Sequence, residues 1–377
     1  MRIGFVFAAS KTSGGGGSYE ERVFQSLTKV AASESFELVK FAKDGSLLAS
    51  EPDEPAENLS SGRRPENNKS SFWRKMALQF SGEGPYRTGL EASLRKERVD
   101  LVWFPSPSQI ISEVRDIPFV MTVWDLAHRE LQIFPEFSEG DTWYRRERLY
   151  QSNVGRAFHV VTESRGTGES LEKIYGLGRK NWTSIGLPLG DAVPPDPEIS
   201  KQVLYPYFYY PANYWAHKNH ITILDALQKL DHKRVGIVMS GSDKGNRAVL
   251  DEYARRNDVG HRVLLLDRIT DAQVQALILE SVAVLMPSLL GPTNYPPLEA
   301  LRFGVPAIVS DVHKYDHEPR AGLVKVAGLD SGAWAVAMAK TLSPDQPDRA
   351  PLFEAPPIDN ELGRILQSFA GSRRLFR

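Results

Sequence analysis

The sequence predicts an α/β protein built from two doubly wound parallel sheets, each in a domain of its own. Short apolar runs, typical of buried strands, alternate along the chain with longer segments of helical period. The second half of the chain repeats this alternation, and a proline-containing stretch with little apolar content, at about 186–202, separates the halves. We therefore expect one domain at 1–200, completed by a C-terminal helix at about 358–377, and a second domain at 201–357.

Each element follows from its local pattern. In the first half, the apolar runs that predict strands are 3–8, 36–42, 100–104, 118–124 and 158–162, and the segments of helical period are 19–31, 86–97, 143–152 and 166–175. In the second half, the strands are expected at 206–210, 235–240, 263–266, 282–286 and 306–310, and the helices at 219–230, 246–255, 271–280, 296–303 and 332–342. Alternation of this kind favours parallel sheets, which bind ligands at the carboxyl ends of their strands.

The composition excludes several classes of function. The chain has 46 Lys and Arg against 47 Asp and Glu, so it has no global basic field of the kind that nucleic-acid binders carry. It has no Cys, which excludes disulfide scaffolds, cysteine-zinc sites, iron–sulfur clusters and cysteine nucleophiles.

No part of the chain predicts a membrane span. No run approaches about 18 consecutive apolar residues, and the N-terminal apolar run is too short for a signal peptide. We expect a cytoplasmic protein with a long loop at 50–72. Peripheral contact with the inner face of the membrane stays open, because the segment 72–80 is amphipathic and the arginine-containing tail at 363–377 has no acid. A helix packed on its own domain and a solvated tail are the alternatives that we favour.

A run of glycines follows the first predicted strand and precedes a helix. Gly14, Gly15, Gly16 and Gly17 would let the backbone pass close to a ligand, and N–H groups ahead of a helix suit anionic or polar groups. The dinucleotide fingerprint fails, because Tyr19 occupies its third glycine position. We predict an acceptor or phosphate loop here, with a flexible loop as the alternative.

Two polar residues end the fourth predicted strand. Asp125 and His128 follow the apolar run at 118–124, and their spacing allows both side chains to face one site. A carboxylate can hold sugar hydroxyls, and a histidine can donate to a hydroxyl or phosphate oxygen. A structural histidine is the alternative.

A third motif spans a strand-to-helix turn in the second half. Lys218 lies between the strand that ends near Pro211 and the helix that begins near Asn219, where an ammonium is well placed for a diphosphate. His217 and His220 have the spacing of half a metal site. Without Cys or carboxylate partners nearby, we reject the metal interpretation.

The strongest motif lies at 287–311 and predicts a strand, a turn, a short helix and another strand. Asn294 is expected to cap the helix, Pro296 and Pro297 are tolerated in its first turn, and Gly304 suits the position after its end.

The same motif carries groups that suit a nucleotide. The turn at 291–295 directs N–H groups towards the ligand, and Glu299 follows in an otherwise apolar helix. A carboxylate of this kind can accept hydrogen bonds from ribose hydroxyls. A well-capped structural helix is the alternative, but it does not explain the acid.

Taken together, these motifs resemble the family-4 retaining glycosyltransferases, which have the GT-B fold of two Rossmann-like domains. The segments HKNH with the following helix and PPLEALRFGVPAIVSD carry the resemblance in the second domain. In the first domain, VWDLAHRE and FPEF are similar to a subgroup of mannosyltransferases for bacterial surface polysaccharides.

The resemblance implies roles for individual residues. The second domain would hold a nucleotide sugar and the first domain the acceptor, with no metal or other cofactor. Lys218 would contact the diphosphate and Glu299 the ribose. Arg268 and Ile269 would pack against the base. The turn of Pro292, Thr293, Asn294 and Tyr295 would supply the amides around the sugar and the phosphate. Asn213 stands where the family usually has an arginine for the diphosphate.

The sequence departs from the family pattern at three positions. Gly291 replaces the first acid of the Glu-x7-Glu motif, Asn213 replaces the arginine, and Trp124 replaces a histidine at the end of the fourth strand. The first two departures support a non-catalytic GT-B scaffold as an alternative. A nucleotide-sugar epimerase is a third interpretation, but it requires more acids than the motifs supply.

The resemblance implies transfer of a hexose, with mannose from GDP-mannose as the specific expectation. The acceptor would be a glycan or lipid-linked glycan in surface polysaccharide or lipopolysaccharide synthesis. Since Gly291 removes the most obvious nucleophile, we expect a direct transfer on the same face of the sugar, with Asp125 and His128 as the catalytic residues.

Overall fold

The computed structural model describes residues 1–8, 15–48, 89–203, 206–291, 294–313, 321–343, 353–355 and 357–375. The predicted loop at 50–72 and the amphipathic segment at 72–80 lie outside these residues, as do Gly14, Pro292 and Thr293. By internal contacts the chain divides into two compact units. Unit 1 comprises Met1–Thr122, Gln151–Val160 and Leu362–Arg377, and unit 2 comprises Val123–Tyr150 and Val161–Glu361. The predicted domain boundary near residue 200 stays a prediction.

The first sheet has six strands in the order β2-β1-β3-β4-β5-β6. Its strands are β1 (Arg2–Phe7), β2 (Glu37–Ala42), β3 (Leu101–Phe104), β4 (Phe119–Val123), β5 (His159–Thr162) and β6 (Trp182–Ser184). The main helices of this part of the chain are α1 (Gly15–Ser33), α3 (Leu90–Lys96), α6 (Thr142–Asn153), α7 (Arg165–Tyr175) and α13 (Asp359–Leu375). The pairs β1–β2, β1–β3 and β3–β4 are parallel, as the alternation of strands and helices predicts.

The second sheet has six strands in the order β12-β11-β10-β7-β8-β9, all in parallel pairs. Its strands are β7 (Tyr207–Pro211), β8 (Gly236–Ser240), β9 (Val263–Leu266), β10 (Val284–Met286), β11 (Ala307–Ser310) and β12 (Leu323–Val326). Its main helices are α8 (His220–Lys229), α9 (Arg247–Arg256), α10 (Asp271–Glu280), α11 (Tyr295–Arg302) and α12 (Ser331–Thr341). This strand order is that of a Rossmann fold.

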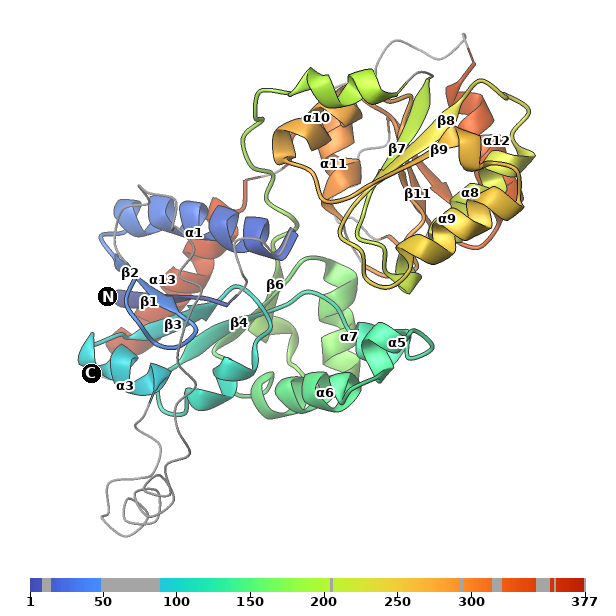
Figure 1. Cartoon of the computed structure of the whole chain (residues 1–377). Coiled ribbons are helices and arrows are strands. Elements are labelled where there is room, and N and C mark those ends of the chain that lie inside the picture. The colour runs from blue at the N-terminus through green and yellow to red at the C-terminus, as the bar shows by residue number, and fades with distance from the viewer. Residues whose placement is uncertain are drawn as a thin grey trace, which may run out of the picture. The chain divides into compact units, whose positions relative to one another are not determined.

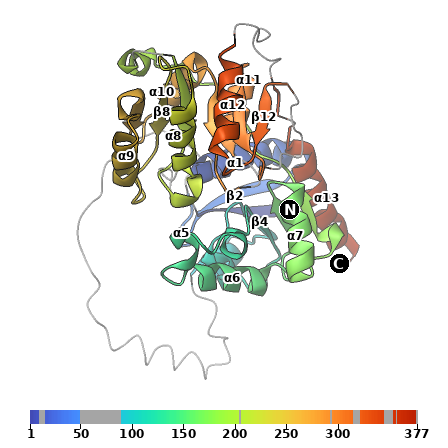
Figure 2. The same cartoon turned by 90° about the vertical axis from the view of Figure 1, so that its right-hand side faces the viewer.

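Helices cover both faces of the second sheet, with α8, α9 and α12 on one side and α10 and α11 on the other (Figure 1). The turned view in Figure 2 shows α8 and α12 near each other, in agreement with their contacts. Because both faces are covered, every residue of β8, β10 and β11 is buried, and these strands are apolar except for a serine at the end of β8 and of β11. The predicted fold class, two doubly wound parallel sheets, is therefore confirmed.

The C-terminal helix α13 belongs with the N-terminal elements of unit 1. Its Gln367 Nε2 donates to Glu34 Oε1, just beyond α1, over 2.7 Å. The rings of Phe369 and Phe158 meet edge to face, 5.0 Å apart. Contacts therefore bring residues 362–377 back to the first part of the chain.

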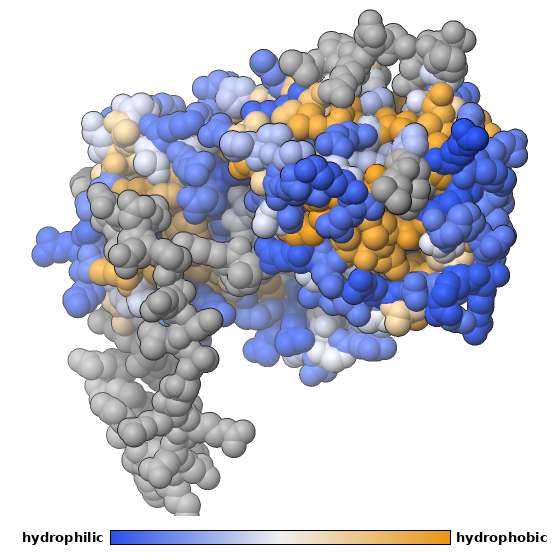
Figure 3. Space-filling view, turned by 45° about the horizontal axis from the view of Figure 1, so that its top comes forward, coloured by the Kyte–Doolittle hydropathy of each residue, from blue (hydrophilic) through white to orange (hydrophobic). Residues whose placement is uncertain are grey.

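Among the described residues, no helix is long and apolar enough to cross a membrane. On the face shown in Figure 3, hydrophobic residues form patches between hydrophilic ones.

Candidate active site

The second sheet changes direction between β7 and β10. From β7 the chain moves outward to β8 and β9, and from β10 it moves the other way to β11 and β12. The loops that leave β7 and β10 therefore diverge, and such a switch point is the usual ligand site of an open α/β sheet. Lys218 follows β7 and Asn294 follows β10, so two predicted donor-binding residues lie at this point.

Lys218 is the last residue of a short 3-10 turn, Ala216–Lys218, which hydrogen bonds hold from several sides. Its carbonyl accepts from the Tyr210 hydroxyl over 2.6 Å, and the carbonyl of His217 accepts from Leu289 N over 2.9 Å. Asn219 then takes the left-handed conformation, with φ of 57°, and α8 begins at the next residue. This rigid turn fixes where the lysine side chain starts.

The Lys218 ammonium lies at the end of a chain of polar side chains. Its Nζ donates to Asn294 Oδ1 over 3.0 Å, and Asn294 Nδ2 lies 3.2 Å from His313 Nδ1. Burial lowers the pKa of His313 to about 3, so its ring is neutral and can accept from the amide. Burial also lowers the pKa of Lys218 to about 8, against the opposing effect of the Asp125 carboxylate. A partly desolvated ammonium in this position suits an anionic ligand.

The prediction that Asn294 caps α11 is wrong. A cap side chain accepts from the second or third N–H of the helix, and here these positions are Pro296 and Pro297, which have no N–H. The Asn294 side chain makes no cap hydrogen bond and binds Lys218 and His313 instead.

The other end of α11 is as expected. Gly304 has φ of 71°, and the bonds from Gly304 N to Leu301 O and from Val305 N to Ala300 O close the helix as a Schellman motif. Glu299 is half-buried on this helix. Its carboxylate is near enough to add to the effect of burial in raising the pKa of Tyr209, a residue of the central strand β7.

Of the remaining predicted donor contacts, Tyr295 is the first residue of α11, and the others lie on the loops after β7 and β9. Asn213 Oδ1 accepts from Ser242 N over 2.9 Å, which joins the ends of β7 and β8. Arg268 is exposed beyond β9, and Ile269 is half-buried against the core. Arg268 and Ile269 are thus placed on a different loop from Lys218, and their contact with a base stays a prediction.

Asp125 follows β4 and is fixed by two partners. Its Oδ1 accepts from Ala127 N over 2.8 Å and also pairs with the guanidinium of Arg146, a residue of α6. The Asp125 side chain is 21% exposed. A charged carboxylate held in this way can accept a hydrogen bond from a ligand hydroxyl.

His128, on the short helix α4 (Ala127–Glu130), is completely buried. Its Nε2 donates to Glu147 Oε2 over 3.0 Å, and Glu147 also binds Arg129 and Tyr175. Burial alone would raise the pKa of Glu147, but hydrogen bonds from these three residues lower it to about 2. Burial lowers the pKa of His128, so the ring is a neutral donor. His128 thus bonds to Glu147, whereas Asp125 bonds to Arg146, and the His128 side chain has no exposed atom that could touch a substrate.

The predicted glycine loop is part of a helix. Gly15, Gly16 and Gly17 form the first turn of α1, where N–H groups lack partners within the helix. Sequence reasoning missed Glu20 in the same helix. This buried carboxylate accepts from Ala8 N over 3.2 Å and from the Ser106 hydroxyl, and so joins the ends of β1 and β3 at the switch point of the first sheet.

His217 and His220 do not form a metal site. His217 Nδ1 lies 2.6 Å from Glu136 Oε1, whereas the ring of His220 packs against Tyr210 and Tyr214. In the described ranges, no group of three or more His, Asp or Glu residues is arranged to hold a metal ion.

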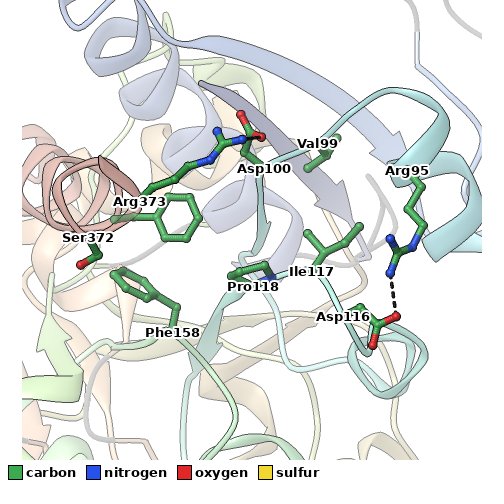
Figure 4. A pocket seen from close by; sticks show the side chains of 10 residues that line it. Arg95, Val99, Asp100, Asp116, Ile117, Pro118, Phe158, Ser372 and Arg373 are labelled. Carbon is green, nitrogen blue, oxygen red and sulfur yellow. Dashed lines mark hydrogen bonds and ion pairs between the residues drawn. The ribbon is translucent and has the colours of Figure 1, made fainter. Parts of the chain in front are cut away.

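A cavity of about 460 Å³ in unit 1 lies away from the carboxyl ends of the strands. Phe158 and Pro118, which line it, stand directly before β5 and β4, and Figure 4 shows them with the Arg95–Asp116 ion pair nearby. Because these residues are at the amino ends of the strands, this cavity is not the candidate active site.

Comparisons with known proteins give a family match for the second sheet. Residues 197–340 match the family described as Glycosyl transferases group 1, and this segment contains β7, β10, Lys218 and Asn294. No curated protein matches the sequence at a significant level.

Solved structures match the fold over nearly the whole chain. Sucrose-phosphate synthase from Thermosynechococcus elongatus is 16% identical, with a TM-score of 0.66, and the match covers 100% of this chain and 98% of the other. Anabaena HepE in complex with UDP-glucose is 14% identical, with a TM-score of 0.62 and coverage of 99% of each chain. The lipopolysaccharide outer core galactosyltransferase WaaB is 14% identical, with a TM-score of 0.59 and coverage of 99% and 100%.

The fold is therefore the GT-B fold of two parallel six-stranded α/β sheets, which the chain shares with solved glycosyltransferase structures. Within this fold, the match of residues 197–340 to Glycosyl transferases group 1 indicates a glycosyltransferase.

Proposed function

We propose that this enzyme transfers a hexose from a nucleotide sugar, with retention of configuration, to a glycan or lipid-linked glycan acceptor. The observation that carries the proposal is the Lys218–Asn294 contact at the switch point between β7 and β10. It supplies a fixed ammonium for the diphosphate, and Glu299 on the adjoining helix supplies an acceptor for ribose hydroxyls.

Asp125 is the residue that we propose for the sugar and acceptor side. Its pairing with Arg146 and its bond from Ala127 N orient the carboxylate, so it serves to hold a hydroxyl rather than to form a covalent intermediate. The leaving phosphate would then take the acceptor proton in a direct transfer on one face, which requires positioning and charge stabilisation from the enzyme. For His128 we propose a positioning role, because its ring is completely buried.

For the sugar, we propose mannose from GDP-mannose, on the resemblance of the VWDLAHRE and FPEF segments. UDP-glucose and UDP-galactose are the donors to compare, since HepE is described in complex with UDP-glucose and WaaB as a galactosyltransferase. Surface polysaccharide or lipopolysaccharide synthesis, at the cytoplasmic side of a membrane, is the setting that we propose.

The test is turnover with a panel of these three donors and a mixture of glycan acceptors, measured as released nucleoside diphosphate. Release that depends on both donor and acceptor is the expected result. Binding of a nucleoside diphosphate without acceptor-dependent release from any donor would contradict the proposed transfer and favour a sugar-nucleotide-binding scaffold.

A further inference from the structure

The FPEF segment encloses one side chain of the candidate site. His217 Nδ1 donates to Glu136 Oε1 over 2.6 Å, and His217 N donates to the same oxygen over 3.0 Å. The rings of Phe137 and Phe134 lie 5.0 Å and 6.3 Å from the His217 ring. Three of the four residues of this segment therefore contact one histidine.

These contacts lie within one compact unit, which includes both 123–150 and 161–361. The side chains of Glu136 and His217 are only 6% and 8% exposed, so water competes little for their hydrogen bonds. Burial lowers the pKa of His217 to about 4, and hydrogen bonds from His217 keep the pKa of Glu136 below its ordinary value despite burial. The pair is therefore a neutral imidazole that donates to a carboxylate.

His217 precedes Lys218 in the same 3-10 turn. One carboxylate oxygen accepts both the backbone N–H and the ring N–H of His217, so Glu136 fixes the backbone of the turn as well as the side chain. The opposite end of the turn is held by Tyr210 through the Lys218 carbonyl. A shift of the turn would move the Lys218 side chain away from Asn294.

We propose that Glu136 is a positioning residue for the donor site: through His217 it holds the turn that places the Lys218 ammonium. This inference rests on the proposed function, in which Lys218 binds the donor diphosphate. It also gives the FPEF segment a role in donor binding, although this segment is distant in sequence from the group 1 domain.

The experiment compares four variants of the full chain by calorimetry with UDP, GDP and ADP, and by donor KM and kcat. Glu136→Ala should weaken binding of the best nucleoside diphosphate by about 3- to 30-fold and raise the donor KM. Glu136→Gln should bind within about twofold of wild type, because its amide oxygen can still accept both N–H groups. Glu139→Ala is the matched control, since it removes an exposed acid just beyond the same short helix, α5 (Pro135–Ser138).

Lys218→Ala separates the two proposals. If Lys218→Ala loses affinity but Glu136→Ala does not, Glu136 has no positioning role. If neither variant loses affinity, the donor site itself is wrongly assigned. If Glu136→Ala does not fold, Glu136→Met, which fills the space but accepts no hydrogen bond, takes its place with the same expected loss. A merely structural role would lower the melting temperature in both the Ala and Gln variants without the selective rise in donor KM.

Discussion

Lys218 Nζ and Asn294 Oδ1 are 3.0 Å apart, although 76 positions separate the two residues in the sequence. The contact joins the loop after β7 to the loop after β10, where the second sheet changes direction. An anion at this point would meet an ammonium whose direction is already fixed, so little conformational freedom is lost on binding.

Lys218→Ala should weaken nucleoside diphosphate binding without unfolding the chain. A charge-assisted hydrogen bond contributes about 1.5–3 kcal/mol, or about a 10- to 150-fold change in affinity. Calorimetry on the folded variant measures this, with Lys233→Ala as a control at an exposed lysine after α8. Unchanged affinity in the Lys218 variant would remove this residue from the site.

Asn294→Asp should weaken binding more than Asn294→Ala does. The new carboxylate would neutralise Lys218 and repel a diphosphate, whereas alanine only releases the ammonium. Asn294→Ala should lose stability through its bonds to Lys218 and His313, whereas Thr270→Ala, which removes the capping box of α10, should lose about 1 kcal/mol through its helix. Calorimetry with a nucleoside diphosphate compares the two Asn294 variants. Equal affinity of Asn294→Asp and Asn294→Ala would contradict the neutralisation of Lys218.

Binding should depend on pH through Lys218. Burial lowers the pKa of Lys218 to about 8, so the free protein loses this charge as the pH rises above 8. The affinity for a nucleoside diphosphate should therefore fall between about pH 7 and pH 9.5, because the phosphates are already ionised in this range. Lys218→Arg stays charged and should show a flat profile. An equal decline in both proteins would place the titrating group elsewhere.

Glu299→Gln should reduce the preference for ribose. The amide keeps one acceptor but loses the charge that strengthens bonds from hydroxyls, a loss of about 1 kcal/mol. Wild type and variant should bind a 2′,3′-dideoxy nucleoside diphosphate with equal affinity. The ribo form should bind more tightly than the dideoxy form, and this difference should be larger in wild type than in the variant. If the variant retains the full preference for the ribo form, Glu299 does not hold the ribose.

Asp125→Ala should lower turnover by about 10- to 1000-fold with little change in nucleoside diphosphate affinity. Asp125→Asn preserves the bond from Ala127 N but leaves Arg146 without its carboxylate, so it should also lose turnover. Full turnover in Asp125→Asn would mean that the residue only caps its turn. His128→Asn, in contrast, should lower stability more than turnover, since the ring lies in a buried network with Glu147.

Much of the fold follows from local pattern. The apolar runs at 306–310 and 158–162 differ from β11 and β5 by at most one residue, because buried parallel strands are largely apolar on both faces. The strands that the sequence did not predict are β6 and β12. Both are short edge strands, and polar or charged residues such as Thr183 and Lys325 interrupt their apolar pattern.

The site was predictable in parts but not in its contacts. Three charged residues could be predicted because each stands next to or within an apolar segment of the sequence. Lys218 and Asp125 follow apolar strands, and Glu299 lies in an apolar helix. Glu136 and His313 could not be predicted, because their contacts are with residues distant in the sequence. Glu136 contacts His217 and His313 contacts Asn294, and no local spacing indicates either contact. Asn294 does not cap α11, because Pro296 and Pro297 suit the first turn of a helix but lack the N–H groups that a cap side chain binds.

Pro296 and Pro297 affect both the stability of α11 and the hydrogen bonding of the Asn294 side chain. A helix that forgoes its cap is weaker at its first turn by about 1 kcal/mol. The amide side chain at the start of the helix accepts instead from Lys218, which lies on another loop. Restoring an N–H at position 296 would let the helix compete with Lys218 for the Asn294 oxygen. Removing prolines from helices to raise thermal stability would therefore weaken the Lys218–Asn294 contact at this turn.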